Sequence, residues 1–530
     1  MFRSYIRRLP GPFLASVVIF ILALAIRIYG FYILDAPGII AERQFRSALI
    51  ARSYYFQMAS FIPEWRLQIA EVSQERAGVL EPPLFELLVA FIYRLVSGEH
   101  LWIARLLSSL FWMVGGVFLY QIAKRMVSAE AAVFTTAYYL FVPLGVVVSI
   151  SFLPEPLMVM FLLFSLFTIL RYYDRPSKTR LVTASVISGL AVLVKPFILF
   201  IVLGAFISQW IYKRATGKRI IDFDLLVYLG ICLSPSASYY LYGIFISKEM
   251  SANFQAGFLP YLFFTQEFWK GWLLTAAGAV GYTPLLAGLL GLSMVPRAAS
   301  RALLIGLWIG YLLFGMAYTY PIPISGHYHL QLMIIVALSI APIIKLISDH
   351  LRQTTTRWYW WLPVLGSLSL AVLFNIRDIR TELASYRQFE NKETAQEIGE
   401  KVNHSSQTIY VASYYGMPLE YYGELSGVYW PRRAVNWDLV KDRFRGLVDQ
   451  PETHPIIKMR NWIFRRLDER TLSVADRFTI LGFSPEYFII SDFEEFNRNH
   501  VDLREFLANN CPLLAESDKY LIYEVKACAK

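Results

Sequence analysis

The stretch from Asp35 to Phe56 reads DAPGIIAERQFRSALIARSYYF and follows directly on an apolar run, Phe13 to Leu34. That run is long enough to cross a lipid bilayer, which takes about 20 apolar residues. A charged segment therefore begins where the first span ends. Phe45 and Leu49 share one helical face of it, while Arg43 falls off that face. The stretch predicts a charged helix that lies on the membrane interface and suits a lipid-linked, anionic substrate. The alternative is a plain surface helix in which Glu42 pairs with Arg46, four residues later.

The composition excludes an ordinary soluble protein. Of 530 residues, 56% are hydrophobic and 17% are charged, whereas soluble domains have about 25% charged residues. The formal net charge is +10, and in a membrane protein such an excess reflects basic cytoplasmic loops rather than nucleic-acid binding. We therefore expect a polytopic α-helical membrane protein, with membrane lipids and no nucleic acid among its partners.

Eleven apolar runs predict the membrane spans. They are residues 13–34, 101–123, 131–149, 157–170, 181–194, 197–212, 225–245, 272–295, 302–318, 330–344 and 358–374. With the N-terminus in the cytoplasm, the basic clusters all fall on the cytoplasmic side, as the positive-inside rule requires. These clusters are residues 124–125, 171–180, 213–219, 297–301 and 345–357. This threading, in which successive runs cross the bilayer in alternate directions, requires a hairpin that turns at Lys195-Pro196.

The threading divides the chain into two domains. Residues 1–375 form the transmembrane domain, whose long first outer loop, 35–100, contains two short helices. These are residues 42–57 and 82–96, the second of which is too short to cross the bilayer and is expected to lie along it.

Residues 376–530 have a polar, mixed composition that predicts a soluble α/β domain on the extracytoplasmic side. Thr408–Ser413 and Tyr487–Ile490 resemble strands. Cys511 and Cys528 lie in this domain, and the sequence leaves open whether they form a disulfide.

The ionisable residues that could carry chemistry gather at the outer ends of the spans. Such residues are costly near lipid and are usually functional. Glu155 lies between two prolines at the entry to a span, where helix capping is the alternative role. Lys195 lies at the hairpin apex, where snorkelling to the surface is the alternative. The full set is Glu42, Arg43, Glu81, Arg105, Glu155, Lys195, His327 and His329.

The sequence contains no glycine-rich phosphate loop and no Cys/His spacing of a zinc site. His327 and His329 are two residues apart and do not face the same way on a helix. Metal ligation and an interfacial polar cluster are the two interpretations of this pair. We expect no cofactor, and a divalent metal remains open.

Six short motifs occur in order along the chain. They are Arg43-Gln44 with Ala48–Arg52, Glu81–Phe85, Ala104–Ser108, Phe152–Met158, Leu193–Pro196 and His327–Leu332. On these motifs the sequence resembles the GT-C class of integral membrane glycosyltransferases, especially the protein O-mannosyltransferase and aminoarabinose transferase superfamily (glycosyltransferase family 39-like). The likeness covers residues 10–350.

The resemblance implies a GT-C fold and transfer of a sugar from a polyprenyl-phosphate-linked donor to a glycan, lipid or protein acceptor at the extracytoplasmic face. In the superfamily the first loop carries an acid as general base or acceptor-positioning residue. Arg43 aligns with the usual Asp, and Glu42 precedes it by one place. Glu42 is the candidate base, with Asp35 and Glu155 as alternatives.

The chemistry of such a transfer suggests further roles. The growing charge on a phosphate leaving group needs cations, and Arg43, Lys195 and His327 are the candidates. Glu81 and Glu155 would orient the substrate or the loop, and Arg105 and His329 complete the substrate-binding set. A non-catalytic lipid-linked-sugar binding or assembly protein of the same fold is the alternative function. A transporter is disfavoured because the span interiors are apolar.

The threading makes a prediction about topology. A reporter fused after Arg219 should be cytoplasmic, and one fused after Asn375 should be extracytoplasmic, because the basic clusters fix the orientation of the spans. Protease or thiol-labelling accessibility of the two fusions measures this. If both reporters lie on the same side, the hairpin at residues 181–212 is wrong.

Overall fold

A computed structural model describes residues 11–33, 41–78, 81–217, 222–246, 259–354, 373, 377, 392–430, 473–479, 481 and 483–528. The chain divides into two compact units. Unit 1 comprises Met1–Ala36 and Trp102–Glu382, and unit 2 comprises Pro37–Leu101 and Leu383–Lys530. The first loop, which the sequence analysis assigned to the transmembrane domain, thus groups with the C-terminal residues. The predicted boundary at residue 375 lies outside the described residues.

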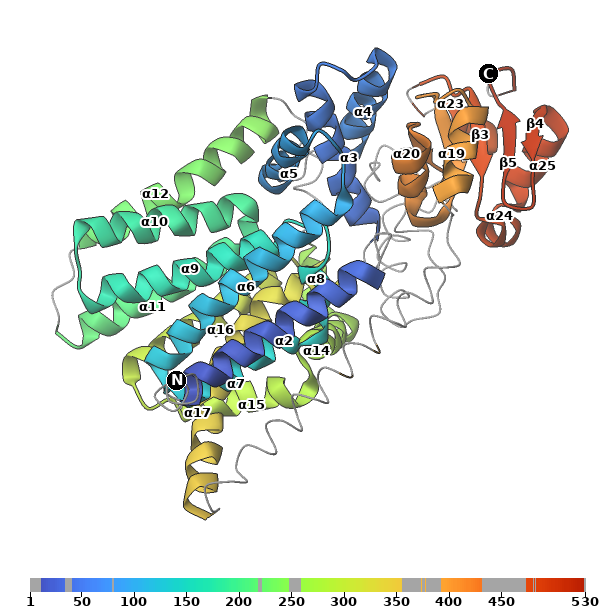
Figure 1. Cartoon of the computed structure of the whole chain (residues 1–530). Coiled ribbons are helices and arrows are strands. Elements are labelled where there is room, and N and C mark those ends of the chain that lie inside the picture. Colours follow the sequence, from blue (N-terminus) through green and yellow to red (C-terminus); the bar gives the residue numbers. More distant parts are fainter. Residues whose placement is uncertain are drawn as a thin grey trace, which may run out of the picture. The chain divides into compact units, whose positions relative to one another are not determined.

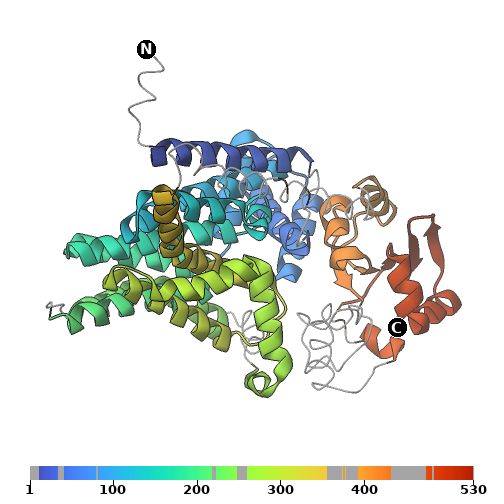
Figure 2. The ribbon, with the colours of Figure 1, turned by 90° about the horizontal axis from the view of Figure 1, so that it is seen from below.

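Unit 1 is a bundle of helices. Its helices are α2 (Gly11–Ile33), α6 (Leu101–Met126), α7 (Ala129–Phe141), α8 (Pro143–Ser149), α9 (Glu155–Asp174), α10 (Lys178–Val194), η1 (Pro196–Ile198), α11 (Leu199–Ala215), α12 (Asp222–Leu241), η2 (Tyr242–Ile246), η3 (Pro260–Phe264), α14 (Gln266–Val280), α15 (Tyr282–Ser293), α16 (Ala298–Ala317), η4 (Gly326–His329) and α17 (Leu330–Thr354). Figure 2 shows α2 along one border of this bundle, where it packs against α7.

Seven described helices are long and apolar enough to cross a membrane, and two bent pairs bring the number to nine. The pairs are α7 with α8, bent by 63°, and α14 with α15, bent by 96°. Each of the nine covers one predicted run. A further predicted run is α10, which has 17 residues, and the run 358–374 lies outside the described residues apart from Leu373. The polytopic helical architecture is confirmed, and the count of eleven spans stays a prediction.

The chain turns at Lys195 and Pro196, as predicted. Proline disfavours the helical conformation in the residue before it, and Lys195 has extended backbone angles (φ −147°, ψ 111°) at the end of α10. Figure 1 shows α10 and α11 extending to the same side of unit 1. α10 packs against α9 and α12, whereas α11 packs mainly against α16. Residues 181–212 are therefore two helices and not one.

Glycines allow α11 and α16 to approach closely. A Cβ atom on Gly306 would lie 2.2 Å from the Gly204 carbonyl oxygen, and one on Gly310 would lie 2.4 Å from the Phe200 carbonyl oxygen. Gly306 and Gly310 are four residues apart and face the same way. In lipid no hydrophobic force drives two helices together. Small residues stabilise such a contact because they allow close van der Waals packing of the two backbones.

Three of the predicted basic clusters meet at one end of unit 1. Arg125 near the end of α6 forms an ion pair with Asp174 at the end of α9. Arg297, just before α16, donates a hydrogen bond to the Arg125 carbonyl. The clusters at residues 124–125, 171–180 and 297–301 thus share an end, as the threading requires.

The C-terminal part of unit 2 contains a five-stranded sheet in the order β2-β1-β3-β5-β4. The strands are β1 (Thr408–Val411), β2 (Gly427–Tyr429), β3 (Tyr487–Ile490), β4 (Leu513–Glu516) and β5 (Leu521–Glu524). β1 is parallel to β2 and β3, and β5 is antiparallel to β3 and β4. The two predicted strands are confirmed as β1 and β3, whereas the other three were missed.

Helices cover both faces of the sheet. They are α19 (Lys392–Lys401), α20 (Met417–Gly423), α23 (Val474–Thr479), α24 (Phe493–Asn499) and α25 (Val501–Asn510). Side chains alternate along a strand, so Ile409 and Val411 enter the core beneath α23, α24 and α25, whereas Tyr410 enters the core beneath α19 and α20. This C-terminal domain is an α/β/α layered fold.

Unit 2 also contains three described helices of the first loop. They are α3 (Ala41–Met58), α4 (Glu64–Ala77) and α5 (Leu84–Val96). The helices predicted at 42–57 and 82–96 are confirmed as α3 and α5. The sequence analysis missed α4, because its buried residues are only Ile69, Ala70 and Ser73 and leave no apolar stripe.

Cys511 and Cys528 form a disulfide, a point that the sequence left open. The bond joins the end of α25 to the segment after β5. Cys232, in α12, is buried and free.

The glycine contact makes a prediction about stability. Gly306→Ala should destabilise unit 1, because the added methyl group would meet the Gly204 carbonyl oxygen on α11. Overpacking of this kind costs about 1–3 kcal/mol. Gly278→Ala is the control, since nothing lies within 4 Å of a Cβ atom at that helical position. Thermal unfolding in detergent measures both, and equal midpoints would contradict the close contact.

Candidate active site

Glu155 and Lys195 form a buried ion pair in unit 1. The Lys195 Nζ atom lies 3.3 Å from the Glu155 Oε1 atom, and the two side chains are 3% and 1% exposed. Glu155 begins α9, and Lys195 follows the last residue of α10. The structure therefore brings together the acid and the cation that the sequence predicted separately, and α9 and α10 hold them because these helices pack along each other.

The burial of Lys195 argues against one role that the sequence left open, which is snorkelling to the surface. A lysine that snorkels would expose its ammonium group, whereas Lys195 is only 2% exposed. Glu155 does lie in the first turn of α9, as a capping acid would. The Glu155 Oε1 atom nevertheless contacts the Lys195 ammonium group. The pair is thus a built polar site rather than a surface feature.

Arg105 lies on α6, one turn before two serines that tie this helix to the loop preceding Glu155. Ser108 Oγ donates to the Ser151 carbonyl at 2.7 Å, and Ser109 Oγ donates to the Ser149 carbonyl at 2.7 Å. Arg105 is itself buried. Its helix therefore borders the loop that delivers Glu155.

His329 takes part in a buried chain of hydrogen bonds. Trp272 Nε1 donates to the Tyr311 hydroxyl at 2.8 Å, and that hydroxyl lies 2.6 Å from His329 Nδ1. His329 Nε2 lies 3.0 Å from the Ile322 carbonyl, which can only accept. The directions are consistent with a neutral imidazole that donates from Nε2 and accepts at Nδ1. Both ring nitrogens are used inside the protein, which favours a supporting role for His329.

His327, two residues before His329, belongs to η4, which contacts the turn that contains Lys195. Tyr328 in η4 contacts Phe197 in η1, with ring centroids 5.6 Å apart, and His327 packs on Tyr328 at 4.5 Å. Phe197 lies two residues after Lys195. His327 is half-buried. η4 therefore borders the hairpin apex, and the phosphate-contact role of His327 stays a prediction.

Glu42 lies in the first turn of α3 and is half-buried. Arg43, the next residue on α3, is the charged side chain that acts on the Glu42 carboxylate. Arg46, which the alternative interpretation of this helix pairs with Glu42, donates to the Gly78 carbonyl at 2.6 Å. Burial raises the pKa of the Glu42 carboxyl, although a backbone hydrogen bond and Arg43 lower it.

The other predicted residues of the first loop belong to the same part of unit 2. Arg43 follows Glu42 on α3, and both Arg43 and Glu81 are half-buried. The bond from Arg46 to Gly78 places the end of α4, three residues before Glu81, beside α3. Ser47 on α3 also donates to Glu86 on α5 at 2.8 Å. Asp35, the alternative base, lies outside the described residues.

Among the described residues, no three His, Cys, Asp or Glu side chains gather in a way that could hold a metal ion. The expectation that no cofactor is needed stays a prediction.

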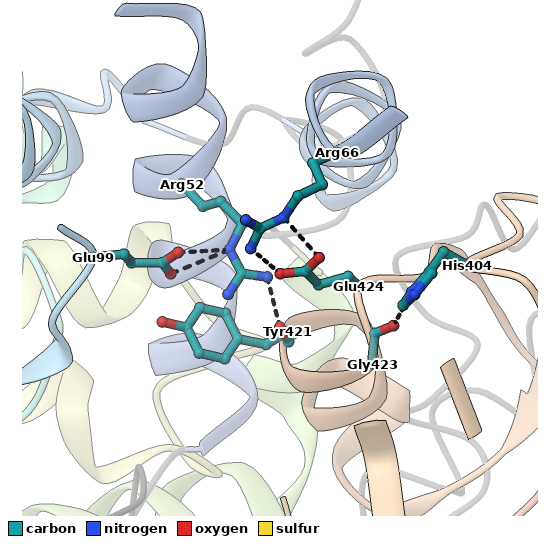
Figure 3. A network of polar contacts seen from close by, with 7 residues as sticks. All are labelled: Arg52, Arg66, Glu99, His404, Tyr421, Gly423 and Glu424. Atoms are coloured by element: carbon teal, nitrogen blue, oxygen red, sulfur yellow. Dashed lines mark hydrogen bonds and ion pairs between the residues drawn. The ribbon is translucent and has the colours of Figure 1, made fainter. Parts of the chain in front are cut away.

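The sequence analysis missed a polar network on α3 and α4 (Figure 3). Arg52 donates to Glu99 and to the Tyr421 carbonyl, and Arg66 pairs with Glu424. Arg52 stands inside one of the quoted motifs, and that was its only signal. Its partner Tyr421 is 369 residues away, so no local pattern could have identified the contact.

Comparison with known proteins supports the resemblance. The family profile of dolichyl-phosphate-mannose-protein mannosyltransferases matches residues 80–240. No curated protein matches the sequence. The matched segment contains Glu81, Arg105, Glu155 and Lys195 but not Glu42.

Solved structures share the fold over nearly the whole chain. ArnT from Cupriavidus metallidurans in the apo state has a TM-score of 0.55 at 16% identity, covering 97% of this chain and 98% of that chain. The same protein bound to undecaprenyl phosphate gives 0.52 at 14% identity, covering 96% and 97%. AglB, an oligosaccharyltransferase from Archaeoglobus fulgidus in complex with an inhibitory peptide and a dolichol-phosphate, gives 0.52 at 12% identity, covering 91% and 69%. The predicted resemblance to GT-C glycosyltransferases is confirmed.

The buried pair makes a prediction about stability and coupling. Lys195→Met should destabilise unit 1 by about 3–5 kcal/mol, because it removes the cation that lies 3.3 Å from the buried Glu155 carboxylate. Adding Glu155→Gln to Lys195→Met should restore much of that loss, since the remaining groups are neutral. Thermal unfolding of the two single variants and the double variant measures the coupling. Additive losses would contradict a direct pair.

Proposed function

We propose that this protein is a glycosyltransferase that moves a sugar from a polyprenyl-phosphate-linked donor to an acceptor hydroxyl at the extracytoplasmic membrane face. The observation that carries the proposal is the buried Glu155–Lys195 pair at the helix ends of a fold shared with ArnT. A buried cation at the end of a predicted span suits an anionic lipid-linked donor.

Ligands in structures of the same fold support the donor class. One ArnT structure is bound to undecaprenyl phosphate, and one AglB structure contains a dolichol-phosphate and an inhibitory peptide. Both lipids are polyprenyl phosphates. By analogy, the donor here is a polyprenyl-phosphate sugar, and the acceptor is a glycan, lipid or protein hydroxyl.

Glu42 is the proposed general base. As the acceptor oxygen bonds to the anomeric carbon of the sugar, its proton passes to the Glu42 carboxylate. The bond from the anomeric carbon to the phosphate oxygen breaks, and polyprenyl phosphate leaves with the electron pair. Burial is the first cause of the raised pKa of Glu42, and a raised pKa suits a group that must accept a proton.

Cations stabilise the leaving phosphate in this proposal. Lys195 and Arg43 are assigned to it, with His327 as a third contact, because growing negative charge on the phosphate oxygens is favoured by fixed positive charge. Glu155 holds the Lys195 ammonium group at 3.3 Å and keeps it in place before the donor binds. Glu81, Arg105 and His329 support the substrate or the surrounding loops.

Two observations support the extracytoplasmic location. Basic clusters gather at one end of unit 1, where Arg125 pairs with Asp174 and accepts from Arg297, and such clusters face the cytoplasm. Unit 2 contains the Cys511–Cys528 disulfide, a bond typical of oxidising compartments. We place the protein in the plasma (inner) membrane, with the C-terminal domain and active site outside the cytoplasm.

The alternative function is that of a non-catalytic lipid-linked-sugar binding or assembly protein. It is favoured by the replacement of the family's usual acid by Arg43. Purified protein incubated with labelled polyprenyl-phosphate-sugar, with and without acceptors, separates the two. We expect release of polyprenyl phosphate that depends on acceptor. Donor binding without release would favour the alternative.

The base assignment predicts a loss of turnover. Glu42→Gln keeps the size of the side chain but cannot take a proton, so kcat should fall about 10²–10⁴-fold. Glu155→Gln and Asp35→Asn are compared in the same assay. A near-normal rate for Glu42→Gln, with a collapsed rate for one of these, would transfer the role to that acid.

The same assignment predicts the acid limb of the pH–rate profile. The base works only when deprotonated, and the pKa of Glu42 is raised. Activity should therefore be lost, as pH falls, at a higher pH than an ordinary glutamate would give. A profile of kcat/KM measures this. A flat profile down to the ordinary glutamate range would contradict it.

A further inference from the structure

We propose that α20 of the C-terminal domain holds α3 in its working position, and that Arg52 is the positioning residue for Glu42. The inference rests on the proposed function, in which Glu42 accepts the proton. It assigns the C-terminal domain a part in catalysis that neither its fold nor its sequence indicates.

Arg52 is enclosed by groups from the end of the first loop and from α20 (Figure 3). Its Nε atom lies 3.1 and 3.0 Å from the two carboxylate oxygens of Glu99. Its Nη1 atom donates to the Tyr421 carbonyl at 2.5 Å, and its Cζ atom lies 3.9 Å from the centre of the Tyr421 ring. The side chain is 9% exposed, so water screens these contacts weakly.

The Tyr421 carbonyl is a suitable acceptor for a physical reason. It belongs to the last turn of α20, where carbonyl groups have no partner within the helix. A cation at this end is favourable. Gly423, the last residue of α20, is bonded in the same way, because its carbonyl lies 2.9 Å from His404 Nδ1. The end of α20 is thus completed by side chains from outside it.

A second ion pair links α4 to Glu424, the residue that follows α20. Arg66 on α4 donates from Nε to the Glu424 Oε2 atom at 2.8 Å and from Nη2 to the other oxygen. The two-pronged geometry fixes orientation as well as distance. Trp65, beside it, stacks on His404 with centroids 4.6 Å apart. Both contacts link the first loop to residues near α20.

Aromatic packing extends the contact toward Glu42. Phe45, three residues after Glu42 on α3, lies with its ring centre 5.5 Å from those of both Tyr421 and Tyr422. Arg52 lies ten residues from Glu42, about 15 Å along the helix at 1.5 Å per residue. α20 therefore touches α3 at two levels, one of them beside the proposed base, and a helix held at two levels cannot rotate or slide.

The matched control is another buried arginine of unit 2. Arg477 on α23 pairs with Asp502 at 2.8 Å, lies 5.3 Å from the Trp430 ring centre and is 5% exposed. Asp502 and Trp430 both belong to the C-terminal domain. Arg477→Gln should therefore weaken that domain without releasing α3, which makes it the comparison for Arg52→Gln.

The experiment measures turnover and the mobility of α3 together. In Arg52→Gln, kcat should fall about 10²-fold, the usual cost of a displacement near 1 Å at a reacting group. Amide hydrogen exchange in residues 41–58 should become faster. The acid limb of the pH–rate profile should move to lower pH, because a displaced Glu42 gains solvent and loses the burial that raises its pKa.

Arg477→Gln should keep kcat within about threefold of wild type, the range expected of a change remote from the reacting groups, with α3 exchange and the acid limb unchanged. Equal losses in the two variants would overturn the proposal in favour of general domain stability. Normal turnover in folded Arg52→Gln would overturn it as well.

A charge swap keeps the test decisive if Arg52→Gln does not fold. Arg66→Glu and Glu424→Arg should each lower kcat, and the double variant should recover at least tenfold of the loss, since the ion pair is re-formed with opposite sense. No recovery would overturn the positioning role. If the wild-type protein releases no sugar from any donor, the proposed function fails instead, and hydrogen exchange still reports whether α20 holds α3.

Discussion

Lipid excludes charge, and α9 shows how unit 1 obeys this constraint. The helix begins with Glu155 and ends with Asp174, about 30 Å apart at 1.5 Å per residue, which is the thickness of a bilayer core. Each terminal acid has a basic partner, Lys195 at one end and Arg125 at the other. Between them the helix buries apolar side chains and small hydroxyl groups. Polar chemistry is thereby confined to the helix ends, and the candidate site lies at one of them.

The parts of the fold that were predicted correctly are those governed by local rules. Apolar length predicted the nine candidate spans found among the described residues, and proline predicted the turn between α10 and α11, because it disfavours a helical residue at Lys195. Local patterning was also enough for α3, α5, β1 and β3. It failed for α4, whose stability comes from neighbours: Arg76 donates to the Ser406 carbonyl at 2.6 Å, a contact that spans 330 residues. A polar helix stabilised by distant partners has no signature in its own sequence.

The candidate site likewise contains residues that local patterns predicted and residues that they did not. Glu155 and Lys195 were identified from their positions at helix ends, and their contact follows from the packing of α9 on α10. Arg52 could not be assigned, because the Tyr421 carbonyl that it binds is a backbone group and any residue could have supplied it. The pairing of Cys511 with Cys528 was likewise open, since two cysteines in one domain need not be close. What sequence conceals is the meeting of segments that lie far apart in the chain.

The free-energy cost of burying the Glu155–Lys195 pair bears on its role. Removing two charges from water costs more than their attraction returns unless geometry is excellent, and apolar residues of similar volume are often equally stable or more so. Neighbouring helix contacts show that this fold can pack without such a pair: α11 and α16 meet through Gly204, Gly306 and Gly310. Stability therefore does not account for a salt bridge whose side chains are 3% and 1% exposed. The proposed function does account for it: a donor phosphate would meet an ammonium group already desolvated and held in place, and the cost of orienting that group would have been met during folding.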